Sequence, residues 1–229
     1  MTNDERLMIF CDFDGTISSQ DVVDVLFETY AEAAWRKIEE EWAEGRITAR
    51  ECLDRQMACT RVSETELAEF LREIQIDSGF LELGLWARDS GVPLIVFSDG
   101  FDSIIDRVFA ASRVDVRDLG IRIFASHLEF KSGVPSWNFP YAFGCAHGCG
   151  TCKPEIIRRL LAPRTVSVFI GDGRSDRFAA ECADEVFAKG WLHTYCAGAA
   201  IPYQPFSNLS DVLPHLGAIH ESALSRKAL

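Results

Sequence analysis

The amino-acid sequence predicts an α/β protein with a doubly wound parallel sheet and a small helical cap inserted after the first strand. Three short apolar runs, at residues 7–11, 92–97 and 165–170, each lead into a polar turn that contains a glycine and carboxylates. Stretches with helical patterns separate these runs, and strands that alternate with helices are typical of a parallel sheet. The stretch between the first two runs is almost continuously helical, which predicts the cap.

The first predicted strand ends in two carboxylates, Asp12 and Asp14, followed by Gly15. Residues two apart in a strand point the same way, and ligands of such sheets bind at the carboxyl ends of the strands. Gly15 allows a sharp turn and a close approach of the backbone to an anion. The same residues would also fit an ordinary turn in which Asp14 caps the next helix. If the two carboxylates share a pocket, they require a compensating cation.

The helical stretch that follows divides the chain into two predicted domains. Residues 21–77 form the predicted cap, and residues 1–20 and 78–229 form the predicted core domain. The alternative is that the inserted helices cover the sheet without forming a cap.

Local signals mark where the helices of this stretch begin and end. Thr48 and Ser63 each begin a capping-box pattern, with a glutamate three residues later. Gly45 follows a periodic run, as a glycine at a helix C-terminus does. Residues 78–90 are predicted to return to the core as a helix.

The second predicted strand runs into Ser98, Asp99 and Gly100. A hydroxyl and free backbone N–H groups at such a turn form a neutral cradle for phosphate oxygens. Ser98 would equally fit an ordinary helix cap. A helix at residues 102–111, a strand at residues 121–125 and a polar, aromatic connection are predicted to follow.

Two later segments add a cation and further carboxylates. Lys153 precedes Pro154, which suits the first position of a helix, so the lysine would lie beside a helix N-terminus that faces the strand ends. A lone lysine is otherwise usually a solvated surface charge. The third strand ends in Asp172, with Asp176 four residues later. Because Mg²⁺ prefers oxygen ligands, Asp172 could complete a metal site with Asp12.

The eight cysteines indicate thiols or metal ligands, because we expect a cytoplasmic chain, in which disulfides are rare. Four potential ligands cluster in one short segment: Cys145, His147, Cys149 and Cys152. They could form a tetrahedral zinc site, contain a redox-active pair, or be reduced cysteines that pack a glycine-rich loop. The sequence leaves these three interpretations open.

The composition narrows the classes of partner. The chain has 229 residues and a formal net charge of -12 without a basic stripe, so we expect neither nucleic acid nor an anionic membrane surface as a partner. No apolar stretch has the length of a membrane span, and residues 1–6 lack the layout of a secretory signal, so we expect a cytoplasmic protein. Any attraction for phosphate must be local. The oligomeric state cannot be read from the sequence.

In their order along the chain, these segments resemble the haloacid dehalogenase superfamily of phosphatases and phosphotransferases. The series of a carboxylate pair, a serine, a lysine and Gly-Asp-Gly with a trailing aspartate is far more specific than any one motif. Within the superfamily the chain is similar to the phosphoserine phosphatase-like subfamily. Residues 149–154 and 186–189 also resemble the methionine-salvage phosphatases that act on 2-hydroxy-3-keto-5-methylthiopentenyl-1-phosphate. The resemblance implies a Rossmann-like core.

The resemblance also implies a role for each motif residue. Asp12 would attack phosphorus and become an aspartyl phosphate, and Asp14 would act as general acid and then general base. Mg²⁺ would be held by Asp12, Asp172 and the backbone carbonyl of Asp14. Asp176 would orient metal-bound water or Lys153. The implied phosphate-binding residues are Thr16, Ser98, Asp99, Gly100 and Lys153, with support of the loop as the alternative role of Thr16.

The resulting hypothesis is a Mg²⁺-dependent phosphatase of a small phosphorylated metabolite, with methionine salvage as the implied context. The presence of Asp14 favours hydrolysis of a phosphate monoester over carbon–halogen cleavage. Ser175 stands where several phosphoserine phosphatases have asparagine, which weakens the case for phosphoserine. The alternatives are a phosphoserine phosphatase, a phosphotransferase or mutase with the same site, and a non-catalytic phosphate-binding module.

Overall fold

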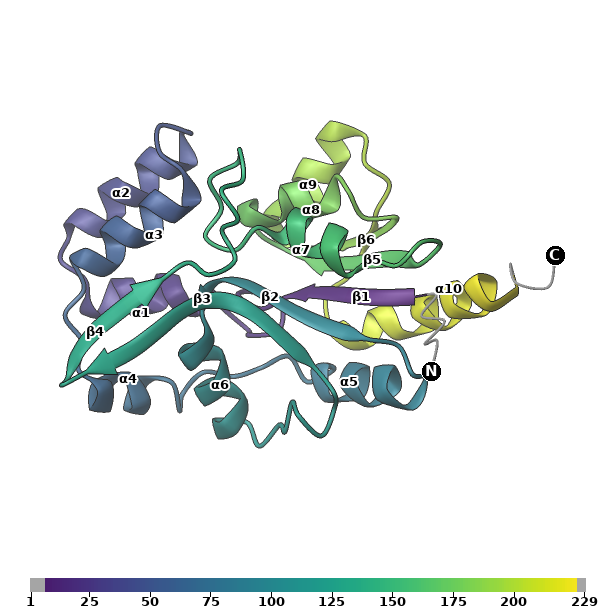
Figure 1. Ribbon diagram of the computed structural model, residues 1–229, viewed down its shortest axis with the longest axis horizontal. Coiled ribbons are helices and arrows are strands. Elements are labelled where there is room, and N and C mark those ends of the chain that lie inside the picture. Colours follow the sequence, from purple (N-terminus) through teal and green to yellow (C-terminus); the bar gives the residue numbers. More distant parts are fainter. Residues whose placement is uncertain (1–6, 226–229) are drawn as a thin grey trace.

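The computed structural model describes residues 7–225, and its central feature is a seven-stranded sheet with the order β4-β3-β2-β1-β5-β6-β7. The strands are β1 (Leu7–Asp12), β2 (Leu94–Phe101), β3 (Arg122–Lys131), β4 (Val134–Asn138), β5 (Val166–Gly171), β6 (Glu185–Ala188) and β7 (Gln204–Pro205). Neighbouring strands pair in parallel, except for β3 and β4. The predicted α/β class with a doubly wound parallel sheet is therefore confirmed, with an antiparallel strand added at one edge (Figure 1).

Helices cover both faces of this sheet. The α-helices are α1 (Val22–Tyr30), α2 (Ala34–Ala43), α3 (Ala49–Ala58), α4 (Glu64–Phe70), α5 (Phe80–Asp89), α6 (Asp102–Ala111), α7 (Lys153–Leu160), α8 (Arg177–Ala180), α9 (Gly190–Ala199) and α10 (Leu213–Ser225). In Figure 1, α7, α8 and α9 lie on one side of the sheet, and α5, α6 and α10 lie on the other. None of the helices within residues 7–225 is long and apolar enough to cross a membrane.

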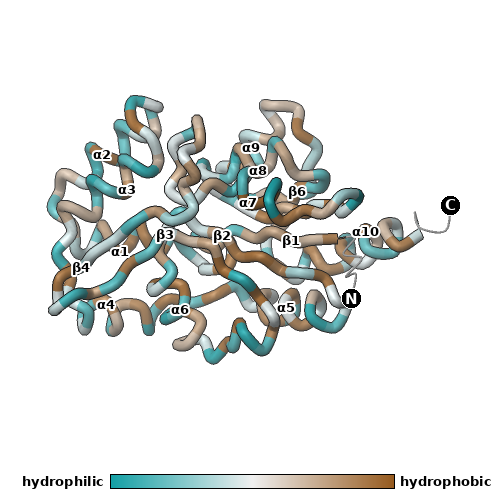
Figure 2. The backbone as a smooth tube through the Cα atoms, in the orientation of Figure 1, coloured by the Kyte–Doolittle hydropathy of each residue, from teal (hydrophilic) through white to brown (hydrophobic). Residues whose placement is uncertain are grey.

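Strand β1 is buried on both faces. Leu7, Ile9 and Cys11 belong to the hydrophobic cluster shared with α5 and α6, whereas Met8 and Phe10 belong to the cluster shared with α7, α8 and α9. A strand that is buried on both faces has a continuous apolar sequence, which is why polar and apolar residues do not alternate in β1. Figure 2 shows the hydrophobic residues concentrated on the central strands.

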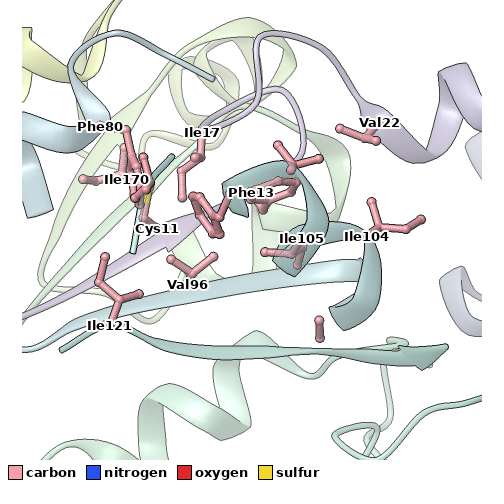
Figure 3. Packing of buried hydrophobic residues seen from close by; sticks show 14 of the residues in the cluster. Cys11, Phe13, Ile17, Val22, Phe80, Val96, Ile104, Ile105, Ile121 and Ile170 are labelled. Atoms are coloured by element: carbon pink, nitrogen blue, oxygen red, sulfur yellow. The ribbon is translucent and has the colours of Figure 1, made fainter. Parts of the chain in front are cut away.

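Aromatic packing fixes the turn that follows β1. The ring of Phe13 meets the ring of Phe109 edge-on at 5.5 Å, and Phe109 stacks on Phe80 at 5.2 Å. Figure 3 shows Phe13 in this packing, close to Ile17 and Ile105. Because Cys11, Phe13 and Ile17 are anchored in the core, the carboxylates of Asp12 and Asp14 between them have a defined direction.

Helices α1 to α4 form the insertion between β1 and α5. Thr48 accepts a hydrogen bond from the N–H of Glu51 at the start of α3, and Ser63 forms a reciprocal capping box with Glu66 at the start of α4. Both predicted helix starts are thus confirmed, as is the return helix, α5. In Figure 1, α2 and α3 lie together beyond the carboxyl end of β1.

The prediction that the strand ends at residue 125 and leads into a polar, aromatic connection was wrong about where the strand ends. β3 continues to Lys131 and turns back as β4 through Ser132 and Gly133, which have φ of 52° and 79°. Positive φ at both turn positions suits a tight hairpin, and Ser-Gly was its only local signal. The indole N–H of Trp137 on β4 donates to Asp54 on α3 at 2.9 Å. The hairpin thus connects the sheet with the insertion.

The end of the chain also differs from expectation. The sequence predicts one short helix at residues 209–216, whereas the structure has a short 3₁₀ turn, Leu209–Val212, followed by α10, which extends to Ser225. Leu216 and Ala223 are buried along α10. The polar side chains between them hid this apolar stripe in the sequence.

Candidate active site

The carboxyl ends of three neighbouring strands bring the predicted motifs together. Asp12 is the last residue of β1 and pairs in register with Phe97 of β2, while Asp172 directly follows β5. β1 lies between β2 and β5, at the point where the strand order reverses, and open α/β sheets bind ligands at such a point. The packing of the central sheet therefore creates the site.

Lys153 occupies the centre of the site. Its ammonium nitrogen lies 2.5 Å from Asp12 Oδ1 and 2.5 Å from Asp176 Oδ1, and its side chain is only 1% exposed. Burial disfavours the ammonium, but Asp12 and Asp176 outweigh burial and raise the pKa of Lys153 above its usual value. Lys153 therefore carries its charge.

Asp176 supports the other groups. Its Oδ1 accepts from Lys153, and its Oδ2 accepts from the backbone N–H groups of Asp172 and Gly173, each at 2.9 Å. Both oxygens are thus engaged in holding the site together.

Thr16 contacts one of the carboxylates of the site. Its buried hydroxyl donates to Asp172 Oδ1 at 2.7 Å, so it orients this carboxylate. Gly15 lies against the other oxygen of the same group: it has φ of 76°, and a Cβ built on it would lie 2.5 Å from Asp172 Oδ2. A glycine is therefore required beside Asp172, both for backbone conformation and for space.

The donor set fits a divalent cation. Oxygen atoms of Asp12, Asp172 and Asp176 all lie within 4.8 Å of one another. Burial first, and then Asp176, raise the pKa of Asp172 to about 6, and the same two causes raise the pKa of Asp12. Three carboxylates around one ammonium leave an excess of negative charge, and hard oxygen donors are those that Mg²⁺ prefers.

Asp14 lies on the pocket side of the turn after β1. Its Oδ1 accepts from the N–H of Val22 at 3.1 Å, and its Oδ2 accepts from the hydroxyl of Ser98 at 2.6 Å. Burial first, and then the charge of Asp21, raise the pKa of Asp14 to about 7. A carboxyl group with this pKa can both donate and accept a proton near neutral pH.

The segment with Ser98, Asp99 and Gly100 belongs to β2 and is no simple turn. β2 continues to Phe101, with an irregularity in its pairing to β3 after Phe97. The N–H of Gly100 donates to Ser98 Oγ at 2.7 Å. The carboxylate of Asp99 accepts from the N–H of Thr151 at 2.7 Å and thereby anchors the loop before Lys153.

A pocket lies between these groups and the helical insertion. Asp12, Asp14, Asp172 and Arg174 line it from the core, and α1, α2 and α3 provide the opposite wall. The sequence did not single out this wall, because acidic residues at the start and along the face of a helix are usually capping or solvated groups. Its polar and apolar members include Asp21, Asp24, Phe27, Glu39, Trp42 and Leu53.

The cysteine-rich loop also comes together in space. Cys145, His147 and Cys149 place their potential ligand atoms within 4.8 Å of one another. Cys152 directly precedes Lys153 at the start of α7.

Comparison with known proteins gives a consistent result. The family model described as haloacid dehalogenase-like hydrolase matches residues 9–181. The chain is 30% identical over 216 residues to a 2-hydroxy-3-keto-5-methylthiopentenyl-1-phosphate phosphatase of Geobacillus thermodenitrificans, covering 93% of this chain and 96% of the relative. It is 26% identical to a protein of the same name from Brevibacillus brevis, covering 96% of this chain and 99% of that one. A solved phosphoserine phosphatase with an analogue of the phospho-aspartyl intermediate has the same fold, with a TM-score of 0.69 and 18% identity, over 93% of this chain and 99% of that one.

Proposed function

The chain belongs to the haloacid dehalogenase-like hydrolase family, and we propose that it is a Mg²⁺-dependent phosphatase that hydrolyses a small phosphate monoester through an aspartyl phosphate on Asp12. The hydrolase family and the phosphatase relatives confirm the class of phosphoric monoester hydrolase expected from the sequence. The observation that carries the proposed chemistry is the convergence of Asp12, Lys153 and Asp172 at the carboxyl edge of the sheet.

In the proposed first step, a carboxylate oxygen of Asp12 forms a bond to phosphorus while the bond to the leaving oxygen breaks. Asp14 donates its proton to that oxygen, so the alcohol leaves neutral. In the second step Asp14 removes a proton from water, the water oxygen bonds to phosphorus, and inorganic phosphate leaves Asp12. A positioned acid and base of this kind contributes roughly 10²- to 10⁴-fold to the rate. Splitting the displacement into two steps is covalent catalysis.

Lys153 holds Asp12 in place throughout and offers positive charge to the phosphate oxygens. We propose Asp12, Asp172 and the backbone carbonyl of Asp14 as ligands of Mg²⁺, because Asp176 already uses both oxygens on Lys153 and on backbone N–H groups. When bound, Mg²⁺ would neutralise the carboxylates and polarise the phosphoryl group. Thr16 would keep Asp172 oriented toward the ion.

The insertion is proposed to act as a cap, residues 21–77, that selects the leaving group. Its pocket wall carries the carboxylates of Asp21, Asp24 and Glu39 beside apolar side chains. Among the described residues that line the pocket, Arg174 is the only lysine or arginine. A leaving group with its own carboxylate would therefore be repelled at this wall, whereas hydroxyl groups can donate to it.

This chemistry favours a substrate such as 2-hydroxy-3-keto-5-methylthiopentenyl-1-phosphate, which the names of the relatives specify. Its leaving group has a hydroxyl group and an apolar thioether end, and it has no carboxylate. Phosphoserine carries an ammonium group that this wall would attract, but it also carries a carboxylate that the wall would repel, and it has no apolar end for Phe27, Trp42 and Leu53. We therefore place the methionine-salvage compound before phosphoserine as the substrate.

The test compares the two esters, with Mg²⁺ and with EDTA, and follows released phosphate. We expect kcat/KM for the methylthiopentenyl ester to exceed that for phosphoserine by at least about tenfold. We also expect EDTA to abolish turnover and added Mg²⁺ to restore it. A preference for phosphoserine would contradict the substrate assignment. Failure to hydrolyse any member of a wider monoester panel would contradict the enzymatic proposal.

A further inference from the structure

The loop at residues 142–152 gathers soft metal ligands next to the active site, and the proposed reaction uses none of them. Ligand atoms of Cys145, His147 and Cys149 lie within 4.8 Å of one another. Cys152 lines the same surface pocket as Cys145 and His147. With zinc–sulfur bonds of about 2.3 Å, the sulfurs of a tetrahedral site lie roughly 3.8 Å apart. The ligand atoms of Cys145, His147 and Cys149 are therefore near the spacing of such a site, and Cys152 is the fourth potential ligand beside them.

Simple packing of apolar thiols does not account for this arrangement. Cys11 and Cys196 show what packing looks like in this chain, because each is fully buried in one of the two hydrophobic clusters. Cys149 and Cys152 are buried as well, but Cys145 is only half-buried and His147 is exposed, so the group reaches from the loop interior to the surface. A half-buried thiol such as Cys145 gains little from contact with other thiols, whereas it remains accessible to a metal ion.

We propose that Cys145, His147, Cys149 and Cys152 bind one zinc ion in a tetrahedral structural site. Three sulfurs and one imidazole nitrogen are ligands typical of zinc, and they differ from the oxygen donors that suit Mg²⁺ at Asp12 and Asp172. The protein supplies all four ligands, so the site has no open position for catalysis. The role of the ion is to hold the loop.

The backbone of the loop is folded in a way that supports these ligands. Cys145 N–H donates to the carbonyl of Ala142 at 3.1 Å, and Gly148 N–H donates to the carbonyl of Cys145 at 3.2 Å. Gly148 has φ of 68°, which permits the turn between His147 and Cys149. The N–H of Cys149 donates to the sulfur of Cys145 at 3.4 Å. Such a bond stabilises a negatively charged sulfur ligand.

The loop connects the insertion with the catalytic lysine. The carbonyl of Gly148 accepts from the N–H of Arg50 on α3 at 2.9 Å, and a Cβ on Gly148 would meet Thr48 at 2.4 Å. At its other end, Thr151 is bound to Asp99, and Cys152 is adjacent to Lys153. A zinc ion in the loop would therefore fix the distance between α3 and Lys153. Loss of the ion should loosen both contacts.

The experiment measures zinc in untagged protein purified under reducing conditions without added metal. We expect about one zinc per chain in the wild type and a loss of most of it in Cys149→Ser. Cys59→Ser is the matched control, because Cys59 is a half-buried thiol at the end of α3, outside the loop. Its zinc content should equal that of the wild type. Replacement of zinc by Co²⁺ should give the visible absorption of tetrahedral cobalt with thiolate ligands.

Three results would overturn the zinc proposal or one of its ligand assignments. Protein that holds no zinc, and gives no cobalt spectrum on reconstitution, would overturn the proposal. Disulfide-linked cysteines in protein kept from reductant, found by peptide mass, would overturn it in favour of a redox pair. His147→Ala keeps the test independent of folding, because His147 is exposed. We expect this variant to bind zinc more weakly than the wild type, and unchanged affinity would overturn the assignment of His147 as a ligand.

Discussion

Lys153 Nζ lies 2.5 Å from Asp12 Oδ1, although 141 positions separate the two residues in the chain. The contact forms because β1 and the start of α7 meet at the same edge of the sheet. Both side chains are almost completely buried, and Asp176 completes the group. A buried charge of this kind is stable only while its partners are present.

Substitution Lys153→Met should therefore affect both stability and activity. Removing the ammonium leaves Asp12 and Asp176 buried without their shared partner, which should lower the free energy of unfolding by about 3–5 kcal/mol. Urea denaturation checks this value, and phosphate release should fall to background. Arg158→Met, which breaks an exposed ion pair with Glu155, serves as the control and should leave stability nearly unchanged. Equal free energies of unfolding for both variants would contradict a stabilising role of the Lys153 ammonium.

Gly15→Ala tests the close approach of the backbone to Asp172. Gly45→Ala is its matched control, because the two glycines have φ of 76° and 75° but a Cβ meets nothing within 4 Å at Gly45. The free energy of unfolding of both variants should fall by about 1–2 kcal/mol, because alanine is strained at a positive φ. Only Gly15→Ala should raise the Mg²⁺ concentration required for half-maximal activity. The same Mg²⁺ requirement in both variants would contradict the role of Gly15.

Thr16→Val removes a hydroxyl at nearly constant size. Because Thr16 orients Asp172 at 2.7 Å, we expect a 10- to 100-fold weaker apparent affinity for Mg²⁺, with phosphate release recovered at high Mg²⁺, as is typical when a group behind a metal ligand is lost. Thr29→Val is the control, since that hydroxyl donates to Val25 on an exposed part of α1. If Thr16→Val instead raises KM for the phosphate ester alone, Thr16 contacts the substrate.

The pH dependence of stability should reveal the metal site. The pKa of Asp172 is raised from its usual 3.8 to about 6, so the native protein binds this proton more tightly than the unfolded chain does. Without a divalent ion, this group's contribution to stability is therefore full below about pH 4 and is lost as the pH rises through about 6. Mg²⁺ competes with the proton, so it should raise the melting temperature more at about pH 8 than at about pH 5.

Thermal melts with Mg²⁺ and with EDTA at the two pH values check this expectation. Asp172→Asn is the control, because it removes both the titrating group and a proposed ligand. It should show little change with Mg²⁺ at either pH. An equal Mg²⁺ effect at both pH values in the wild type would contradict the assignment.

Much of the fold and the motif geometry could be predicted because strand ends are local features. The apolar run of β1 and the Asp12 that ends it are adjacent in the sequence, and the parallel sheet brings such ends together. Lys153 could be placed because Pro154, which follows it, indicates the first turn of a helix. The structure brings these residues into contact as expected.

Contacts that depend on side-chain direction could not be predicted. The hydroxyl of Thr16 reaches Asp172 from a distant segment, and no pattern near Thr16 specifies that partner. Glu39 lines the pocket only because α2 packs beside α3, where its carboxylate accepts from Gln56 at 2.9 Å. The β3–β4 hairpin could not be predicted because its edge strand, β4, is only partly buried and shows no clear alternation of apolar and polar residues.

Trapping the covalent intermediate tests the central claim most directly. In Asp14→Asn, hydrolysis of the intermediate should slow by roughly 10²- to 10⁴-fold, because the residue that removes a proton from water is lost. The variant is mixed with substrate and Mg²⁺, quenched in acid and analysed by peptide mass spectrometry. We predict one added phosphoryl group on the peptide that contains Asp12, and none in the double variant that also carries Asp12→Asn. An unmodified Asp12 peptide from a variant that still releases the alcohol would contradict the account.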